Sequence, residues 1–180
     1  MSEKILLYSV EQISAKVAEL GAAIRTEYEQ LLAPGEQLLA VGVLNGAFIF
    51  MADLVRAMAD LPVEVDFVRL SSYQDRDSSS SEVVMTKNLE KEIKGRHVLI
   101  VEDIADCGLT LAWLVDFLKK RGPKSIKVAV AVDKRARRET PVDLDYVAFT
   151  LDDGFLVGYG LDYAEKYRNL PAIYQVVTTK

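Results

Sequence analysis

The stretch "HVLIVEDIADCGLT", residues 97–110, decides the fold of this protein. It opens with a continuous apolar run, which is typical of a strand buried on both faces of a parallel sheet. The run ends in Glu102 and Asp103, and a short polar loop containing Gly108 leads into "TLAWLVDFLKKRG" at 110–122, which has the pattern of a helix. Neighbouring strand residues point to opposite faces, so two consecutive carboxylates cannot both be hydrated unless the strand opens into a cleft. The stretch therefore predicts a strand, loop and helix unit with a polar cleft at the strand end.

Similar units flank this stretch. Ser9 and Gln12 form a capping-box pattern at the start of a helix that reaches Leu31 and is stopped by Pro34-Gly35. Further strands are predicted at 38–43, 63–70, 82–88, 126–132 and 145–150, shorter ones at 155–160 and 172–177, and a helix at 47–59. The serine-rich stretch 71–81 has little to bury, so we expect a mobile loop there. Together these elements predict an α/β fold with a mainly parallel, twisted sheet flanked by helices.

Composition limits the possible functions. A chain of 180 residues, half of them hydrophobic, is expected to form a single domain. Its formal charge of −5 gives no general attraction to nucleic acid or to an anionic membrane. The single cysteine excludes an internal disulfide, and no apolar run approaches the length of a membrane span or resembles a signal peptide. We therefore expect a soluble, cytoplasmic protein with no nucleic-acid or membrane partner.

The loop after the acidic strand end has two interpretations. Free amides at the start of the following helix would suit a phosphate, but the loop could equally be an ordinary connection in which Asp106 or Thr110 caps the helix. The carboxylate pair would suit sugar hydroxyls, or a magnesium ion shared with phosphates. The chain matches neither the glycine-rich dinucleotide pattern nor the Walker A pattern. In parallel sheets ligands bind at the carboxyl ends of strands, so "LNG", "EDIADCGLT", "DKRARRE" and the loop around "DDGF" are the segments of interest.

Five segments together resemble a known enzyme family. "VLIVEDIADCGLTL" is similar to the signature segment of the purine phosphoribosyltransferases, which use 5-phosphoribosyl 1-diphosphate (PRPP). "GVLNGAFIFMADLVR", "VDFVRLSSY", "DKRARR" and "FLVGYGLDYAEKYRNLP" follow in the order and spacing of the hypoxanthine-guanine phosphoribosyltransferase family. The resemblance extends from about Val41 to Pro171 and implies the type I phosphoribosyltransferase fold. One domain, 1–180, would comprise a core at about 36–150 and a small hood from about 151–180 with part of the N-terminus.

The resemblance also implies an activity in purine salvage. It is transfer of the 5-phosphoribosyl group from PRPP to N9 of hypoxanthine, and of guanine, giving the nucleotide and pyrophosphate. The expected cofactor is Mg²⁺, and the expected assembly is a homodimer or homotetramer. A xanthine- or guanine-preferring relative, or a nucleotide-sensing regulator with the same fold that binds RNA or DNA, remains an alternative. The base preference, and the choice between dimer and tetramer, are not determined by the sequence.

Matching positions carry over the roles of the family's site residues. Glu102 and Asp103 would hold the ribose hydroxyls, directly or through magnesium, and Asp106 would exchange a proton with N7 of the purine. The 5-phosphate would bind to the loop made of Asp106, Cys107, Gly108, Leu109 and Thr110. The purine would be held by Lys134 at O6, by stacking on Phe155 and by the backbone of Leu156, with Asp162 helping to hold a second magnesium. Pyrophosphate would contact Arg168 and a loop, with a cis peptide in relatives, formed by Leu44, Asn45 and Gly46. Ser72 and Tyr73 would belong to a flexible loop that closes over the site.

Several of these residues have simpler interpretations when taken singly. Arg168 could be a surface arginine, Asp162 a turn former and Phe155 ordinary core. Cys107 stands where the family usually has threonine, so we interpret it as a substitution in the phosphate loop and not as a catalytic thiol. Asn45 replaces the lysine of many relatives, so a direct charge on pyrophosphate or a subunit contact is missing.

Two other features are interpreted as structural. His97 opens the strand instead of ending it, so we expect a structural or exposed side chain. The basic run Lys134–Arg138 is expected to be a solvated loop with one functional lysine.

Overall fold

The computed structural model describes residues 2–74 and 81–178 of the chain. Its elements in chain order are β1 (Ser2–Tyr8), α1 (Val10–Leu31), β2 (Leu38–Leu44), α2 (Phe48–Ala57), β3 (Val63–Gln74), β4 (Ser81–Lys87), β5 (His97–Ala105), α3 (Leu109–Lys119), β6 (Ser125–Lys134), β7 (Tyr146–Leu151), β8 (Leu156–Val157) and β9 (Ile173–Thr178). The main sheet has the strand order β4-β3-β2-β5-β6-β7, and a second, three-stranded sheet has the order β1-β9-β8. None of the helices in the described part of the chain is long and apolar enough to cross a membrane.

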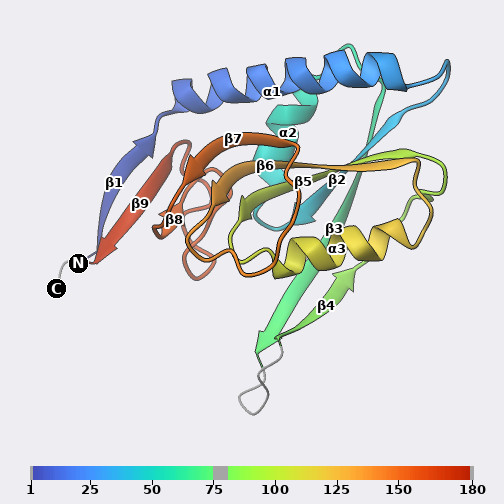
Figure 1. The fold of residues 1–180 in the computed structure, drawn as a ribbon. Coiled ribbons are helices and arrows are strands. Elements are labelled where there is room, and N and C mark those ends of the chain that lie inside the picture. The colour runs from blue at the N-terminus through green and yellow to red at the C-terminus, as the bar shows by residue number, and fades with distance from the viewer. Residues whose placement is uncertain (1, 75–80, 179–180) are drawn as a thin grey trace.

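Helices cover both faces of the main sheet. α1 and α2 lie over one face and α3 over the other (Figure 1). Successive residues of β5 alternate between the two layers: Leu99 and Val101 pack in the core beneath α1 and α2, whereas Val98 and Ile100 pack in the core beneath α3. The continuous apolar run is thus explained, because each residue from Val98 to Val101 packs in one of the two helix layers. The prediction of a mainly parallel sheet covered on both faces is confirmed.

The direction in which the sheet grows reverses between β2 and β5. The chain passes from β2 to β3 on one side, and later returns to place β5 on the other side of β2, with all three strands parallel. Gly42 of β2 is aligned with Val101 of β5, so the residues that follow both strands leave the sheet next to each other. These are the "LNG" segment and the acidic pair. A crevice outside the carboxyl ends of the strands at such a point is the usual ligand site of an open α/β sheet.

The predicted helix ends agree closely with the structure. Both hydrogen bonds of the capping box between Ser9 and Gln12 are present, and α1 ends at Leu31, before Pro34-Gly35. α3 begins one residue before the predicted start, and it ends at Lys119. Gly122 then takes a φ of 71°, the left-handed conformation that glycine tolerates after a helix.

The strand predicted at 155–160 is only the two residues of β8, and two other differences are larger. Residues 71–74 were predicted as loop but extend β3, where Ser72 is aligned with Val83 and Tyr73 with Glu82 of β4. Backbone hydrogen bonds to an antiparallel neighbour hold this segment, so it needs no apolar pattern of its own. The backbone of Ser72 and Tyr73 thus lies in β3, and their role in a flexible loop that closes over the site stays a prediction. The rest of the predicted loop, 75–80, lies outside the described residues.

The second difference is β1, which the sequence pattern does not indicate. Its Ile5 and Leu6 are about half exposed, and its pairing partner is β9 at the other end of the chain. Figure 1 shows β1 and β9 side by side, apart from the main sheet. No local periodicity can report such a pairing, because the strand is defined by a partner about 170 residues away.

Candidate active site

The acidic pair lies at the end of β5, as predicted. Glu102 is 8% exposed and Asp103 is half-buried. Each carboxylate accepts a hydrogen bond from the next backbone amide, Glu102 from Asp103 N at 3.1 Å and Asp103 from Ile104 N at 2.8 Å. Burial, followed by the charge of Asp103, raises the pKa of Glu102 well above its ordinary value, and burial also raises the pKa of Asp103. Two carboxylates are thus held close together, and their burial and mutual repulsion are unfavourable. A bound cation or a hydroxyl donor would reduce this electrostatic cost.

The "LNG" segment faces this pair across the switch point. The peptide bond between Leu44 and Asn45 is cis, which agrees with the expectation from the family. A Cβ on Gly46 would lie 1.8 Å from Oδ2 of Asp103, and a Cβ on Gly160 would lie 2.0 Å from the carbonyl oxygen of Gly46. Only glycine fits at either position. The backbone of this loop is therefore packed directly between the acidic pair and the C-terminal segment.

Asp106 and Lys134 form an ion pair between the ends of β5 and β6. Nζ of Lys134 lies 3.1 Å from Oδ2 of Asp106 and 3.7 Å from Oδ1 of Asp153, and the lysine is only 6% exposed. Arg137 approaches the same oxygen of Asp106 at 3.5 Å. The other carboxylate oxygen, Oδ1, is buried and has no hydrogen-bond partner among the described residues. A buried acceptor without a partner is costly, so this atom has capacity for a donor from a ligand.

A cavity of about 200 Å³ brings together most of the residues predicted for the base. Asp103, Asp106, Lys134, Phe155, Leu156 and Asp162 all line it. The Phe155 side chain is 48% exposed, so it is not ordinary core, and its ring meets that of Tyr163 edge to face at 5.3 Å between centroids. An exposed aromatic face beside a buried cation and an acceptor is suited to a flat, polar heterocycle.

The loop between β5 and α3 forms a second, smaller cavity. It has a volume of about 110 Å³ and is lined by residues that include Glu102, Asp106, Cys107, Gly108 and Thr110. Gly108 is the N-cap of α3 with a φ of 86°, and no side-chain hydrogen bond caps the helix. The simpler interpretation, in which Asp106 or Thr110 caps this helix, is therefore wrong. An uncapped helix start at the base of a small cavity presents amides and the positive end of the helix dipole to an anion.

Arg168 and Asp162 interact at the rim of the site. Their ion pair is 3.0 Å long, and Arg168 also contacts Glu165 at 3.1 Å and donates to the carbonyl oxygen of Gly160 at 2.8 Å. The arginine side chain is only 19% exposed, and its Nε is buried without a hydrogen-bond partner among the described residues. Asp162 also accepts a hydrogen bond from the amide of Glu165, three residues on, so its interpretation as a turn former is correct as well. Arg168 is thus a mostly buried arginine whose side chain is fixed by these contacts next to Gly160 and the "LNG" loop, and it is not a surface arginine.

The carboxylates are chemically suited to magnesium. Within residues 2–74 and 81–178, no group of three His, Cys, Asp or Glu side chains could hold a metal ion by itself. Mg²⁺, however, is commonly held by one or two carboxylates together with water and substrate phosphates. Glu102 and Asp103 offer such a pair, and in the described part of the chain neither forms a salt bridge with a basic side chain. The residues present therefore fit a magnesium ion that arrives with a phosphorylated substrate.

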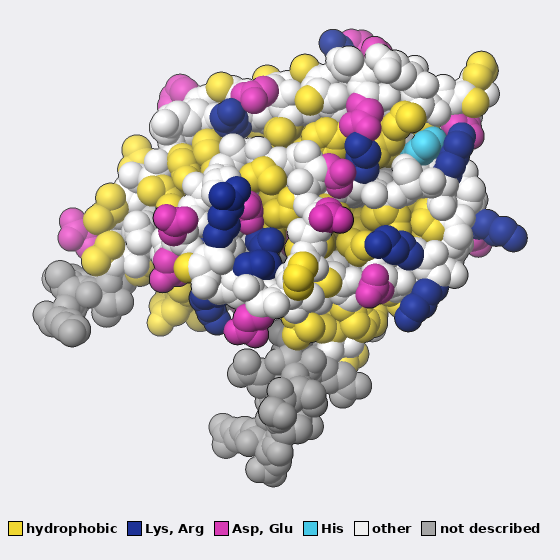
Figure 2. Space-filling view, in the orientation of Figure 1, with side chains coloured by type: hydrophobic (Ala, Val, Ile, Leu, Met, Phe, Trp, Pro, Cys, Tyr) yellow, Lys and Arg dark blue, Asp and Glu magenta, His cyan; other side chains and the backbone are white. Residues whose placement is uncertain are grey.

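The basic run differs from its prediction as a solvated loop with one functional lysine. Lys134 ends β6 and is buried, and the side chain of Arg138 is only 20% exposed. Arg138 donates to backbone carbonyls of the β5–α3 loop, a role that sequence reasoning missed because a charge run carries no signal of its contacts. On the face shown in Figure 2, basic side chains are interspersed with acidic ones. His97 is predicted to be structural or exposed, and the structure shows that it is buried. Its Nδ1 lies 2.7 Å from Oγ of Ser125.

A larger cavity lies elsewhere. It has a volume of about 570 Å³ between α1, α2 and Asn169–Pro171, and none of the predicted site residues lines it. Size alone does not identify a site, and the convergence of carboxylates, a buried lysine and an uncapped helix start lies at the strand ends.

Comparison with known proteins agrees with this geometry. The family model described as "Phosphoribosyl transferase domain" matches residues 8–164. The hypoxanthine-guanine phosphoribosyltransferase of Bacillus subtilis is 47% identical over 171 residues, which is 95% of this chain and 91% of that protein. The hypoxanthine phosphoribosyltransferase of Haemophilus influenzae is 45% identical over 172 residues, which is 96% of this chain and 94% of that protein.

Solved structures show the same similarity in three dimensions. A hypoxanthine-guanine phosphoribosyltransferase from Bacillus anthracis superimposes with a TM-score of 0.88 at 40% identity, covering 98% of this chain and 100% of that one. A variant of the Trypanosoma cruzi hypoxanthine phosphoribosyltransferase, solved as a ternary complex with substrates, gives a TM-score of 0.90 at 38% identity. It covers 98% of this chain and 96% of that chain.

Proposed function

The chain belongs to the phosphoribosyltransferase family, and from this premise we propose how its own residues carry out the reaction of its relatives. Its activity is that of the hypoxanthine-using members: in purine salvage it transfers the 5-phosphoribosyl group from PRPP to hypoxanthine, releasing pyrophosphate. The observation that carries the residue assignment is the 3.1 Å pair of Lys134 and Asp106 in the cavity beside Phe155.

Recognition of the base is assigned to the cavity of about 200 Å³. Lys134 would donate to O6 of the purine, because its ammonium group has three N–H donors and its contact with Asp106 does not use all of them. Adenine carries an amino group at that position and would leave the lysine without a new partner, which penalises the wrong base. Phe155 would stack on the ring, and the backbone at Leu156 would contact its edge. On this assignment guanine is accepted as well as hypoxanthine, because both have the 6-oxo group.

Proton handling is assigned to Asp106. As N9 attacks C1 of the ribose, the bond from C1 to the pyrophosphate oxygen breaks, and positive charge would build up on the purine. Asp106 accepts the proton from N7 and so keeps the base neutral, which is general base catalysis. Its Oδ1 supports this role, because it is buried and without a hydrogen-bond partner among the described residues. Oδ2 stays paired with Lys134, so one residue couples recognition of O6 to proton transfer at N7.

The phosphates are assigned to two loops. The 5-phosphate would bind the amides from Asp106 to Thr110 at the uncapped start of α3. Cys107 replaces the usual threonine there, so this loop lacks one hydroxyl donor. Pyrophosphate would be held by the Leu44–Gly46 loop and by Arg168, which contact each other through Gly160.

Magnesium would be held by Glu102 and Asp103 near the ribose, with Asp162 near the pyrophosphate. When bound, it neutralises charge on the leaving pyrophosphate and orients it. The two carboxylates would hold the ribose 2- and 3-hydroxyls directly or through this magnesium and water. To help hold magnesium, Asp162 would have to share its oxygens with Arg168 and with the amide of Glu165, which already contact them.

Broader features complete the proposal. The chain would act in the cytoplasm as a homodimer or homotetramer. The sheet of β1, β9 and β8 would form the hood, with the core at about residues 36–150, because Phe155 and Leu156 lie where this sheet borders the cavity.

The test is an assay of pyrophosphate release from PRPP with hypoxanthine, guanine, xanthine or adenine as acceptor. We expect release with hypoxanthine and guanine, little with adenine, and loss of activity on chelation that is restored by added Mg²⁺. A circular dichroism spectrum unchanged by chelation serves as the control for folding. Release with none of the 6-oxopurines would reject the activity, and a preference for xanthine would reject only the base assignment.

A further inference from the structure

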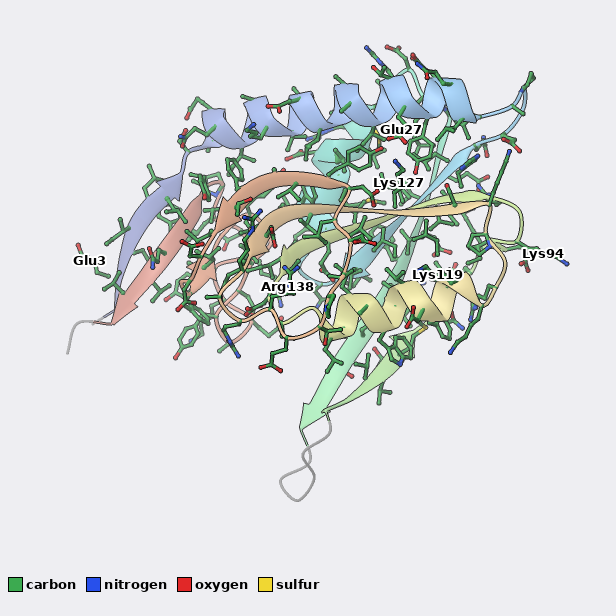
Figure 3. The ribbon with its side chains drawn as sticks, in the orientation of Figure 1. Glu3, Glu27, Lys94, Lys119, Lys127 and Arg138 are labelled. Carbon is green, nitrogen blue, oxygen red and sulfur yellow. The ribbon has the colours of Figure 1, made fainter. Side chains whose placement is uncertain are left out.

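One side chain outside both cavities holds the loop that carries Asp106. Arg138 lines neither the 200 Å³ cavity nor the 110 Å³ cavity. Its Nε donates to the carbonyl oxygen of Asp106 at 2.9 Å, and its Nη2 donates to the carbonyl oxygen of Ala105 at 2.9 Å and to Oδ1 of Asp133 at 2.6 Å. One guanidinium group thus joins the end of β5, the loop after it and the end of β6. Figure 3 shows Arg138 at this end of the sheet, near the start of α3.

These contacts begin where the pairing between strands stops. Ala105 is the last residue of β5 and is aligned with Asp133, the residue before Lys134 in β6. Beyond this pair, the ladder of backbone hydrogen bonds between β5 and β6 ends and no longer fixes the following segments relative to each other. Arg138 takes over that task with a planar group that can donate in several fixed directions. Asp133 is 6% exposed, so the bond that it accepts is shielded from water.

The neighbours of Arg138 continue the same attachment. The carbonyl oxygen of Cys107 accepts hydrogen bonds from the amides of Glu139 and Thr140, each at 3.0 Å. A Cβ on Gly108 would lie 2.3 Å from the carbonyl oxygen of Thr140. The loop from Ala105 to Gly108 is therefore seated along residues 138–140. The bonds from Glu139 and Thr140 are made by the backbone, whereas those from Arg138 are made by its side chain. A mutation of Arg138 can therefore remove its bonds.

We propose that Arg138 is a positioning residue that sets the location of the Asp106 carboxylate relative to Nζ of Lys134. The inference rests on the proposed roles of those two residues in the transfer reaction. Arg138 acts through the backbone of Asp106 and not on the substrate. The ion pair attracts the two side chains but does not by itself fix where they sit, whereas N7 and O6 of a purine have one fixed spacing. Misplacement by about 1 Å can cost about 100-fold in rate.

The test compares two arginines that share one partner. Arg138→Lys keeps the positive charge beside Asp133 but cannot bridge two carbonyls and a carboxylate. Arg135→Lys is the matched control, because Nε of Arg135 contacts the other oxygen of Asp133 at 3.0 Å and its side chain is 64% exposed. We expect Arg138→Lys to lower kcat/KM for hypoxanthine by about 100-fold, mainly through kcat. Arg135→Lys should stay within about twofold of the wild type.

A double-mutant cycle separates positioning from general damage. In an Asp106→Asn background the carboxylate to be positioned is gone, so adding Arg138→Lys should cost no more than about twofold. An equal loss in both backgrounds, or near-normal activity of Arg138→Lys alone, would overturn the inference. Should Arg138→Lys fold poorly in thermal unfolding, Arg138→Gln is judged by the same cycle. An inactive wild type would instead reject the proposed function, so the two failures are distinguishable.

Discussion

Nζ of Lys134 lies 3.1 Å from Oδ2 of Asp106, and the opposite oxygen of that carboxylate is buried without a hydrogen-bond partner in the described part of the chain. One oxygen is therefore engaged by the residue proposed to read the base, and the other has capacity for a donor. This division is what the proposed role requires, because the carboxylate can pair with Lys134 and still accept a proton on its other oxygen.

Replacing the carboxylate of Asp106 tests its proposed role in proton transfer. Asp106→Asn keeps the size and one acceptor for Lys134, so we expect a melting temperature close to that of the wild type. Loss of a general base typically costs about 10²–10⁴-fold, and kcat should fall within that range. Steady-state kinetics with hypoxanthine and thermal unfolding of the same preparation check both parts. A variant with near-normal turnover would remove Asp106 from proton transfer.

Removing the charge of Lys134 tests base recognition. A hydrogen bond to a charged group is worth about 1.5–3 kcal/mol, so Lys134→Met should lower kcat/KM for hypoxanthine by about 10- to 150-fold. The KM for PRPP should change less, because no phosphate contact is assigned to this lysine. Lys127→Met is the matched control on the same strand, since Lys127 pairs with Glu27 instead (Figure 3), and also with Asp145. Equal losses in the two variants would argue against a specific role for Lys134.

The contact between Gly46 and Asp103 predicts a rescue by a second mutation. Gly46→Ala would place its Cβ 1.8 Å from Oδ2 of Asp103, and such overpacking costs about 1–3 kcal/mol of stability. In an Asp103→Ala background the obstructing carboxylate is absent, so the same change should cost clearly less. Urea unfolding of the four proteins in this cycle measures the difference. Equal costs in both backgrounds would show that the loop can move away from Asp103 without penalty.

The buried His97 predicts how stability depends on pH. Burial, with the nearby charge of Lys124 adding to it, lowers the pKa of His97 in the folded state below its usual value of about 6.5. The unfolded chain then binds a proton more readily, so acidification favours unfolding. The stabilisation is fully present above about pH 6.5 and is lost as the pH falls through the folded-state pKa. Raised pKa values at Glu102 and Asp103 act in the opposite direction, so a comparison with a variant is needed.

His97→Asn provides that comparison. Asn can still hydrogen bond to Ser125 but does not titrate. Between pH 7.5 and 5 the wild type should lose stability relative to this variant, by at most about 1.4 kcal/mol for each unit of pKa difference. Melting temperatures measured across this range in one buffer series test the effect. Parallel curves for the two proteins would mean that His97 does not contribute to the pH dependence.

The elements on which the fold depends were readable from local patterns. The apolar run of β5, the capping box at Ser9 and the stop at Pro34-Gly35 each depend on residues only a few positions apart. The adjacent carboxylates at the end of β5 likewise predicted the cleft. Burial of two neighbouring charges is unfavourable unless a ligand or solvent reaches them. Naming a chemistry for each position needed the family resemblance, since spacing alone left both an anion site and an ordinary turn possible.

The sequence by itself thus determined the order of the strands and helices after β1, the acidic strand end and the segments that gather around it. Only the tertiary structure decided that Lys134, 28 residues from Asp106, pairs with it, that Arg138 bonds to the backbone where β5 ends, and that β1 pairs with β9. The physical reason is the same in each case. Periodicity and capping report interactions between near neighbours in the chain, whereas ion pairs, backbone clamps and the pairing of chain ends are made through space and leave no local pattern.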